Sequence, residues 1–508
     1  MERLLQRDVA VAGVVVLVSF FASRILWDLK LSPLARQRIP GPAIAAVTEL
    51  WYFWRGVKLD RPMALDKLFK EYGPVVRIGP SRVAFLDIEA IHLMHRLMPF
   101  NKADFLAKMT FGGRPNTVST NDPAIHAKFR RWHAPALRGA HLKKTAVVII
   151  QQMDNLVQRF MEDGEDAAGI DVFHLMKIHT LDILGLAILD TKFDQIRTRQ
   201  ELPLAKNMAN WLLDLMIRTA LPEVVDKFLR LLPHKGLQEI FAADEAVCQL
   251  AGKLYDETPD EPTESENISV LAAGKWYRDP TTGETTTREE VIGDMGIFLI
   301  AGTDTTAVSL TYALYQLARL PVIYETLRAE LKSAGMDGDS YDIDVLRGLP
   351  YFNAFIKEIL RIHAPAGELL ERVVPNGGTV LAGYSIPEGT TVGASSYASG
   401  MREDLFPNAP HVDPERWVKK TATGWSERPN LEKMNAAWHP FNLGVRACVG
   451  RPLAEIEQLL TITAVVRNFR IVLHETTTED SMSPIDIAVI MPKAQKCLLR
   501  FIPNPLHD

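Results

Sequence analysis

The sequence predicts a mainly α-helical fold with small β-sheets, the α+β class, on two observations. Apolar residues recur with helical spacing over three long stretches, residues 143–161, 237–255 and 321–334, and this period of 3.6 is typical of amphipathic helices. The strand-like pieces are short and bounded by turn residues. We therefore expect packed helices, with strands in a minor role.

Three segments have the composition of strands. VVRIG at residues 75–79 and VAFLD at residues 83–87 are short β-rich runs. Residues 378–395 alternate apolar side chains between Gly-Tyr and Pro-Glu-Gly turns, a pattern typical of hairpins. These segments predict the small sheets.

The N-terminus begins with an apolar run, residues 9–22, which is broken by a single serine and extended by Ile-Leu-Trp. A membrane-spanning helix needs about 20 residues, a length reached with Trp27 at the interface and Arg24 snorkelling. A cleaved signal peptide is the alternative, but the bulky Ile-Leu-Trp segment does not resemble a small-residue cleavage site. Basic residues flank the run on both sides, and slightly more of them follow it than precede it. This distribution slightly favours a catalytic part on the cytosolic side of the membrane.

A proline-glycine elbow, RIPGP at residues 38–42, follows this run and cannot continue a helix. No second linker or internal repeat follows the elbow. We therefore predict a membrane anchor at residues 1–30, a proline-rich elbow at 31–45 and one catalytic domain at 46–508.

The bulk composition excludes several classes of protein. The hydrophobic fraction of 47% supports a large core, and the net charge of −5 lacks the basic footprint of a nucleic-acid binder. The three cysteines, Cys248, Cys448 and Cys497, are far apart in the sequence. This spacing excludes a zinc ribbon and argues against a disulfide scaffold.

Cys448 lies in a small basic loop, FNLGVRACVG, which directly precedes a predicted helix. Unpaired N–H groups and the helix dipole at such a position favour thiolate over thiol, and Arg446 adds positive charge. Gly444 and Gly450 let a flat partner approach closely. A buried structural thiol, the commoner fate of a free cysteine, fits the other two cysteines better.

A very long buried helix is predicted from Thr287, which has capping-box spacing to Glu290, to about residue 320, before a proline. Gly302, Asp304 and Thr305 interrupt its apolar middle. A buried acid beside a hydroxyl forms a proton-delivery pair. The alternative, a threonine bonded back to its own helix carbonyl, stays open on the sequence alone.

Two further pairs of polar residues have helical spacing. Glu358 and Arg361 share a helix face, and Arg416, in a proline-stiffened loop, can close a buried network in place of an ordinary surface ion pair. His126 and Arg130 lie one turn apart and can face one anion, although a solvated basic face is the alternative.

The order of these motifs resembles that of the cytochrome P-450 superfamily, the haem-thiolate monooxygenases. The series runs from HAKFRR through AGTDTT, Glu-x-x-Arg and Pro-Glu-Arg-Trp to Phe-x-x-Gly-x-Arg-x-Cys-x-Gly. The resemblance covers essentially the whole chain from the elbow onward. The HAKFRR and AGTDTT motifs are most similar to those of fungal secondary-metabolism enzymes of the pisatin demethylase type. The N-terminal apolar run resembles the membrane anchor of microsomal members.

This resemblance implies a role for each matching residue. Cys448 is the expected axial ligand of the haem iron, and Phe441 is expected to shield its sulfur. Asp304 and Thr305 are expected to deliver protons during dioxygen chemistry, with Ala301 and Gly302 leaving space. The loop glycines Gly444 and Gly450 let Cys448 approach the porphyrin, and Glu358, Arg361 and Arg416 are structural.

The expected partners of the haem propionates are basic residues: His126, Arg130, Arg372 and Arg446. Many relatives use Trp-x-x-x-Arg on the early basic helix, whereas this chain has His126 and Arg130 at that spacing. Trp132 lies at a different spacing.

The resemblance therefore implies monooxygenation of an apolar small molecule, a fungal secondary metabolite, by a haem b enzyme of the endoplasmic reticulum membrane with its catalytic domain in the cytosol. NADPH acts through a separate reductase, because no dinucleotide-binding glycine fingerprint follows a strand. The expected pocket segments include residues 105–117, 366–370 and 488–490. No nucleic-acid partner is expected.

Two alternatives remain at this point. One is a haem-thiolate isomerase or dehydratase that does not use dioxygen, against which the intact Asp304–Thr305 pair argues. The other is a non-catalytic haem- or lipid-binding membrane protein. The sequence does not specify the substrate or the position oxidised.

Overall fold

The computed structural model describes residues 15–16, 18–221, 223–262, 268–338 and 340–504. The chain divides into two compact units. The first comprises residues 1–103, 368–399 and 443–446, and the second comprises residues 104–367, 400–442 and 447–508.

Half of the predicted anchor, residues 1–14 and 17, lies outside the described residues. Residues 18–26 are helical, and their apolar side chains, including Phe20 and Phe21, are exposed. Among the described residues, two helices are long and apolar enough to cross a membrane, Val172–Leu189 and Arg288–Arg319, but both are mostly buried inside the fold.

A five-stranded sheet organises the first unit, with strand order β1-β2-β8-β5-β3. The only parallel pair in this sheet is β2 with β8, and the other neighbours are antiparallel. Its strands are β1 (Val75–Gly79), β2 (Arg82–Phe85), β3 (Asn101–Lys102), β5 (Leu369–Val373) and β8 (Thr391–Ser395). Val83, Phe85 and Val392 are fully buried in the apolar cluster that packs on it.

The other elements of the first unit are short. The hairpin β6–β7 is formed by Thr379–Leu381 and Tyr384–Ile386. The helices are η1 (Trp27–Leu31), α2 (Pro33–Arg36), α3 (Ala43–Val47), α4 (Leu50–Val57), α5 (Arg61–Tyr72), α6 (Ile88–His92), η2 (Leu93–Leu97), α21 (Ser396–Gly400) and η4 (Gly444–Arg446). All three predicted strand segments are thus confirmed, and residues 378–395 supply three strands.

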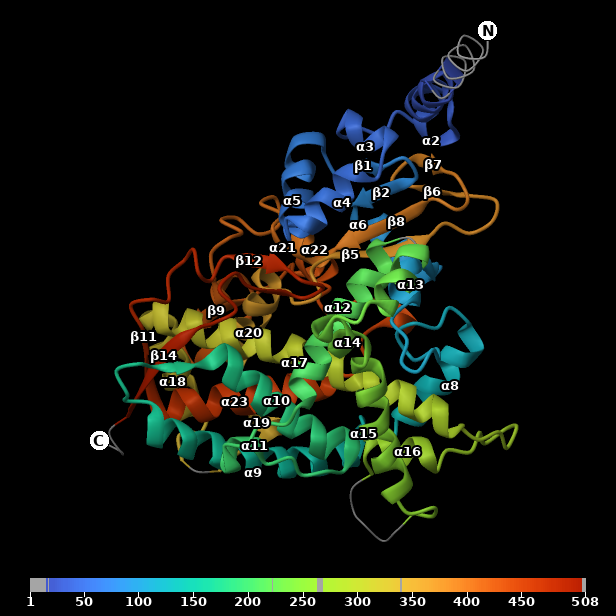
Figure 1. The fold of residues 1–508 in the computed structure, drawn as a ribbon. Coiled ribbons are helices and arrows are strands. Elements are labelled where there is room, and N and C mark those ends of the chain that lie inside the picture. The colour runs from blue at the N-terminus through green and yellow to red at the C-terminus, as the bar shows by residue number, and fades with distance from the viewer. Residues whose placement is uncertain (1–14, 17, 222, 263–267, 339, 505–508) are drawn as a thin grey trace. The chain divides into compact units, whose positions relative to one another are not determined.

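The second unit is built around one long helix, α17 (Arg288–Arg319). Thr287 and Glu290 form the predicted capping box, and the helix ends directly before Pro321. Figure 1 shows α17 running alongside α10 (Val172–Leu189) and α23 (Arg451–Asn468), which both contact it. Because helices cover it on several sides, nearly every residue from Val291 to Leu317 is buried.

The remaining helices of the second unit surround this centre. They are α7 (Asp104–Ala107), α8 (Pro123–His133), α9 (Gly139–Asp163), α11 (Gln195–Thr198), α12 (Leu204–Ala220), α13 (Glu223–Leu231), α14 (Lys235–Phe241), α15 (Ala243–Glu257), α16 (Val270–Lys275), α18 (Pro321–Ser333), α19 (Ile343–Arg347), α20 (Pro350–Ile362), η3 (Pro414–Arg416) and α22 (Glu432–Ala437). The strands are β4 (Ile170–Asp171), β9 (Val418–Thr421), β10 (Gly424–Glu427), β11 (Phe469–Leu473), β12 (Pro484–Asp486), β13 (Ile490–Pro492) and β14 (Leu498–Pro503).

The three helices predicted from periodicity are present, with one difference. Residues 143–161 and 321–334 correspond to α9 and α18. The expected single helix over residues 237–255 is divided at Ala242 into α14 and α15. No residue of α14 is buried, whereas α15 buries one side against α17. The division follows from this packing, since no glycine or proline marks it.

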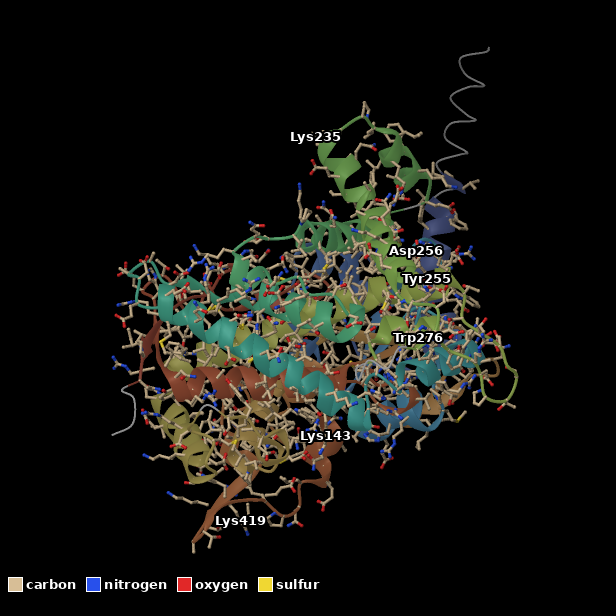
Figure 2. All side chains as sticks on the ribbon, turned by 90° about the horizontal axis from the view of Figure 1, so that it is seen from below. Lys143, Lys235, Tyr255, Asp256, Trp276 and Lys419 are labelled. Atoms are coloured by element: carbon tan, nitrogen blue, oxygen red, sulfur yellow. The ribbon has the colours of Figure 1, made fainter. Side chains whose placement is uncertain are left out.

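Ion pairs and hydrogen bonds hold the first turn of α17. Arg288 Nη2 lies 2.7 Å from Asp256 Oδ2, near the C-terminal end of α15. Lys275 Nζ donates to the carbonyl of the neighbouring Tyr255 at 3.0 Å. Figure 2 shows Tyr255 and Asp256 together at this end, close to Trp276. The start of the central helix is therefore fixed to α15, which is in turn bonded to α16.

Glu358 is the centre of a buried polar network in the second unit. Arg361 donates to both oxygens of this carboxylate, at 2.7 and 2.8 Å, and Trp417 Nε1 donates to Oε1 at 2.8 Å. Arg416 Nε lies 3.4 Å from Oε2. The predicted Glu–Arg–Arg network is confirmed. The alternative prediction, an ordinary surface ion pair, is wrong because both Glu358 and Arg361 are fully buried.

We predict that Glu358→Gln destabilises the folded protein by about 3–5 kcal/mol, because it leaves the buried Arg361 guanidinium without its counter-charge. Urea unfolding followed by circular dichroism measures this loss. Asp404→Asn is the control, since it removes a more exposed ion pair with Arg402 and is expected to cost less than about 1 kcal/mol. Equal losses in the two variants would contradict the central role of Glu358.

Candidate active site

The loop that carries Cys448 directs backbone donors at its thiol. Cys448 N–H donates to the carbonyl of Phe441 at 2.8 Å, which closes the turn. Burial raises the pKa of the thiol, whereas the N–H groups of Gly450 and Arg451 lower it, as do the charges of Arg130 and Arg451. The predicted effect of the helix end is present, but burial is larger, so the pKa lies above its ordinary value. A metal ion that takes the sulfur as thiolate reverses this balance.

The Cys448 side chain is exposed among the described residues, although burial is the largest influence on the pKa of its thiol. A side chain added at Gly450 would place its Cβ 3.9 Å from the Cys448 Sγ atom, an ordinary van der Waals contact. Packing against the described residues therefore does not by itself require glycine at position 450.

A second accessible patch interrupts the buried surface of α17. Ala301 is exposed and Gly302 and Thr305 are half-buried, whereas their helix neighbours are buried. Residues at positions i, i+1 and i+4 lie on one side of a helix. A Cβ at Gly302 would lie 2.9 Å from Leu184, so this glycine also admits close packing of α10. Ala301 and Gly302, which were predicted to leave space for dioxygen, are therefore accessible.

Asp304 and Thr305 point to different partners. The Thr305 hydroxyl donates to the Ala301 carbonyl at 2.7 Å, the back-bonded arrangement that the sequence left open. Asp304 Oδ1 lies 2.9 Å from Lys177 Nζ on α10. Lys177 also lies over the Phe173 ring, 4.6 Å from its centroid. Sequence analysis missed Lys177, because nothing in its local pattern distinguishes it from a surface lysine.

The two predicted propionate partners on α8 lie on its inner side. His126 is buried, and Arg130 Nη1 donates to the carbonyl of Ala447 at 3.1 Å, beside Cys448. Burial lowers the pKa of Arg130, and no carboxylate among the described residues forms an ion pair with it. Its neighbour Arg131 is exposed and pairs with Asp279 at 2.9 Å. Only part of this basic helix face is therefore solvated.

The first unit contributes its own basic residues. Arg372 on β5 is buried; its Nη1 donates to the Glu371 carbonyl at 2.8 Å, and its Nε atom has no partner in the described part of the chain. Burial, together with the charge of Arg446, lowers the pKa of Arg372 to about 10. A buried guanidinium without a carboxylate calls for an anion from elsewhere.

Gly444, at the start of η4, has a φ of +68°. A Cβ at this position would lie 2.6 Å from the carbonyl oxygen of His95. Both the backbone angle and the close contact require glycine here.

The aromatic shield predicted beside Cys448 has partners that the sequence did not indicate. The Phe441 ring packs edge-on against Trp438, with centroids 6.3 Å apart, and the Arg451 guanidinium lies 5.2 Å from its centroid. Trp438 Nε1 donates to the carbonyl of Lys357 at 3.0 Å. The position of Phe441 is thus tied to α20 and to the first turn of α23.

These residues fit a haem group. The second unit offers an exposed thiol, an accessible stripe on α17 and an arginine without a carboxylate among the described residues. In the first unit, taken by itself, the buried Arg372 guanidinium has an Nε atom without a partner in the described part of the chain. A thiol suits an iron that takes sulfur, and guanidinium groups without carboxylates suit the anionic groups of such a cofactor.

A family model described as Cytochrome P450 matches residues 45–498. The chain therefore belongs to the cytochrome P450 family and is a cytochrome P450 monooxygenase, which confirms the predicted resemblance. Solved structures agree on the fold, which includes the helices and small sheets predicted. The chain matches the cytochrome P450DA heme domain with a TM-score of 0.72 at 20% identity, over 87% of this chain and 93% of that one.

Curated fungal proteins match over nearly the full length. Tryprostatin B 6-hydroxylase of Neosartorya fischeri is 29% identical, over 95% of this chain and 84% of that protein. Pisatin demethylase of Fusarium vanettenii is 27% identical, over 91% and 90%. A cytochrome P450 monooxygenase, orf2, of Aspergillus niger is 27% identical, over 96% and 97%.

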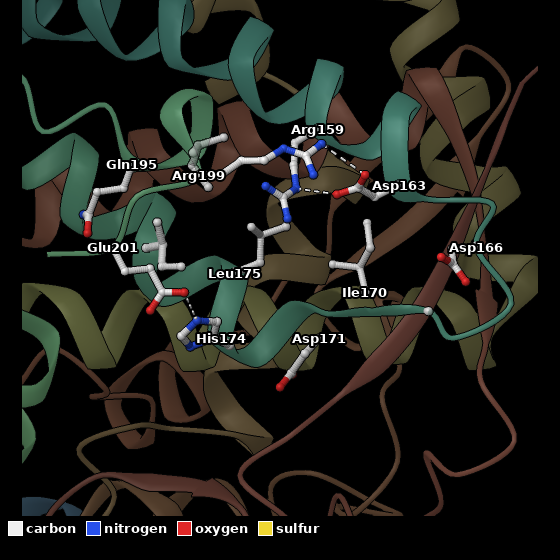
Figure 3. A pocket seen from close by; sticks show the side chains of 13 residues that line it. Arg159, Asp163, Asp166, Ile170, Asp171, His174, Leu175, Gln195, Arg199 and Glu201 are labelled. Atoms are coloured by element: carbon white, nitrogen blue, oxygen red, sulfur yellow. Dashed lines mark hydrogen bonds and ion pairs between the residues drawn. The ribbon is translucent and has the colours of Figure 1, made fainter.

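A separate open pocket of about 460 Å³ lies among α9, β4, α10 and α11, and none of the predicted site residues lines it. Its charged side chains pair with one another (Figure 3). Arg159 lies 2.7 Å and Arg199 3.1 Å from Asp163, and His174 lies 2.8 Å from Glu201. Apolar side chains such as Ile170 and Leu175 line the pocket as well.

Glu457 on α23 is a buried acid near the cysteine loop in sequence. Burial raises the pKa of its carboxyl to about 8, against a smaller, opposing influence of the nearby Thr180 hydroxyl. The unfolded chain releases this proton near its ordinary pKa of 4.5, so the folded state binds the extra proton between these values. The contribution to folding stability is therefore greatest below pH 4.5 and is lost as the pH rises toward 8.

We predict that Glu457→Gln flattens the pH dependence of stability. The wild-type protein is expected to lose up to about 1.4 kcal/mol of unfolding free energy per pH unit in this window from this group. Urea unfolding at pH 5.5 and 7.5 measures the difference. Glu455→Gln, which alters a part-exposed pair with Arg451 on the same helix, should keep the wild-type slope, and an unchanged slope in Glu457→Gln would contradict the assignment.

Proposed function

We propose that this cytochrome P450 is a membrane-anchored monooxygenase that inserts one oxygen atom of O2 into an apolar fungal secondary metabolite. Electrons come from NADPH through a separate reductase that docks near Cys448. The observation that carries the proposal is the accessible thiol of Cys448, together with the accessible Ala301–Thr305 stripe of α17. Hydroxylase and demethylase relatives support an oxidative reaction on a small molecule.

The residues that would hold haem b are those that the sequence motifs indicate. Cys448 would supply the sulfur ligand of the iron, and the haem propionates would be bound by His126, Arg130, Arg372 and Arg446. When bound, the haem supplies an iron centre that takes up electrons and activates dioxygen. Phe441 shields the sulfur, and Gly444 and Gly450 let the cysteine loop approach the porphyrin.

The proton-handling residues act from α17. Thr305 holds its hydroxyl on the accessible side of the helix, and a hydroxyl rotates between its own carbonyl and another acceptor. Asp304 holds its charge against Lys177. Lys177, being partly exposed, connects this carboxylate with solvent. We propose that protons pass from solvent by way of Lys177 and Asp304 to Thr305.

Membrane attachment through the N-terminus, with the catalytic domain on the cytosolic side of the endoplasmic reticulum, is part of this proposal. The exposed apolar side chains of residues 18–26 support it, because such a surface is stable in lipid and costly in water. An anchored enzyme also receives apolar substrates from the bilayer. A haem-thiolate isomerase would need neither Asp304 nor Thr305, and their presence favours the oxidative reaction.

The first test is the spectrum of the dithionite-reduced protein with carbon monoxide. We predict a strongly red-shifted Soret band for the wild-type protein, because thiolate donation changes the electronic state of the haem iron. Cys448→Ala should lose this band, whereas Cys497→Ala, at a buried cysteine, should keep it. Folded, haem-containing wild-type protein without the band would overturn the assignment of Cys448.

The second test separates Thr305 from a matched threonine on the same helix. Thr303 forms the same back-bond, to the Leu299 carbonyl at 2.7 Å, but is buried away from the accessible stripe. A positioned proton donor typically contributes about 10²–10⁴-fold to the rate of its step. In a system reconstituted with a reductase, we therefore expect Thr305→Ala to divert reduced dioxygen to peroxide and to raise the peroxide released per NADPH by about 10-fold or more. Thr303→Ala should match the wild type, and equal effects would contradict the role of Thr305.

A further inference from the structure

A fully buried pair, His133 on α8 and Asp294 on α17, takes no part in the chemistry described above. His133 Nε2 hydrogen-bonds to Asp294 Oδ2, and both side chains are 0% exposed. The other carboxylate oxygen, Oδ1, accepts the backbone N–H of Thr117 at 2.7 Å. One carboxylate thus joins two helices and the loop that precedes α8.

The His133 ring is held on several sides by aromatic residues. It lies edge-on to Phe298, with centroids 4.9 Å apart, and edge-on to Trp132 at 4.1 Å. The Phe129 ring is parallel to it at 6.3 Å. Because this cage fixes the imidazole, the carboxylate of Asp294 is fixed as well, and a buried carboxylate is stable only while such partners remain in place.

The pair lies on the functional side of α17. Asp294, Phe298, Ala301 and Thr305 are spaced by four, three and four residues, so they share one face of the helix. Ala301 and Thr305 are the accessible residues of that face. The bond from Asp294 to Thr117 therefore attaches the loop two helical turns before the accessible stripe, on the same side.

The loop, residues 111–120, also contacts neighbouring helices at its N-terminal end. The Phe111 ring fills a notch at Gly296, where a Cβ would lie 2.6 Å from the ring, and it stacks on Trp211 of α12 at 4.4 Å. Asp244 of α15 accepts the N–H of Gly112 at 2.9 Å and Trp211 Nε1 at 3.1 Å. The two ends of the loop are thus each held by one aspartate.

Asn116 shapes the middle of the loop. Its Oδ1 atom accepts the N–H groups of Val118 and Ser119, both at 2.9 Å, and its Nδ2 donates to the Met109 carbonyl at 2.6 Å. The loop has no regular secondary structure beyond an isolated bridge at Phe111 and Arg114. Its position over α17 consequently depends on these side-chain contacts.

We propose that His133 and Asp294 are positioning residues that hold the loop 111–120 beside the accessible face of α17 and thereby limit the size of substrate admitted there. The proposal rests on the proposed monooxygenase function, in which the substrate lies against the accessible stripe of α17. Asp294 holds the loop directly, and His133 acts through Asp294.

Hydrogen exchange in the full-length haem-loaded protein tests the positioning. Asp294→Leu removes both acceptors, and His133→Phe keeps the ring but removes the donor. In both variants we expect peptides covering the loop to exchange about tenfold faster or more, because a buried charge-assisted hydrogen bond is lost. His133→Gln, whose amide reaches the Nε2 position, should restore slow exchange.

Asp182→Leu is the matched control. Asp182 is also a buried aspartate of this unit, and it accepts the backbone N–H groups of Gln195 and Ile196 at 3.1 and 2.9 Å. This variant should speed exchange near residue 195 and leave the loop unchanged. Wild-type exchange of the loop in Asp294→Leu and His133→Phe would overturn the proposal. Should Asp294→Leu fail to fold, His133→Phe against His133→Gln decides alone.

Spectral titration tests the effect on size selection. Imidazole and the bulky azole clotrimazole bind haem iron with a common type of spectral shift. We expect the ratio of their Kd values to change at least fivefold in His133→Phe, through clotrimazole, while imidazole binding stays constant. An unchanged ratio would overturn the selection role. The red-shifted band with carbon monoxide in the same samples reports separately on the haem-thiolate function.

Discussion

The proposed function depends on one constraint, which is that the Cys448 thiol has to ionise where burial opposes ionisation. Burial raises the pKa of this thiol. Two N–H groups at the start of α23 and the charges of Arg130 and Arg451 act in the opposite direction. The loop therefore prepares the sulfur for a metal ion without holding it as a free thiolate, so ligation and cofactor binding are coupled.

The central helix α17 separates several functions along its length and around its circumference. Its capped start is tied to α15. Asp294 holds a loop at the next turns, and Ala301 and Thr305 form the accessible stripe further along. Asp304, although adjacent to Thr305, is directed to Lys177 on α10. One buried helix can carry these roles because adjacent residues point about 100° apart.

The charged residues follow one rule, that a buried charge has either an internal partner or an external one. Glu358 and Arg361 satisfy each other, and their network is structural. Arg130 and Arg372 have no carboxylate in the described part of either unit. The energetic cost of burying an unpaired guanidinium separates these two arginines from the Glu358–Arg361 network and supports their proposed role as partners of an anionic cofactor.

Much of the fold could be predicted from the sequence, and the sequence motifs were enough to propose the site residues, because these signals are local. The cap at Thr287, the strand at 75–79 and the glycine-bounded Cys448 loop depend on neighbours within a few residues. The Glu358–Arg361 pair is local as well, since helical spacing places both on one face.

Only the tertiary structure decided which distant groups meet. Nothing near Lys177 in sequence indicates Asp304, and nothing near His133 indicates Asp294. The break at Ala242 likewise follows from which helix face finds a partner. The reason is physical: spacing along one chain segment sets which residues share a face, whereas burial and contact across helices depend on how those faces pack.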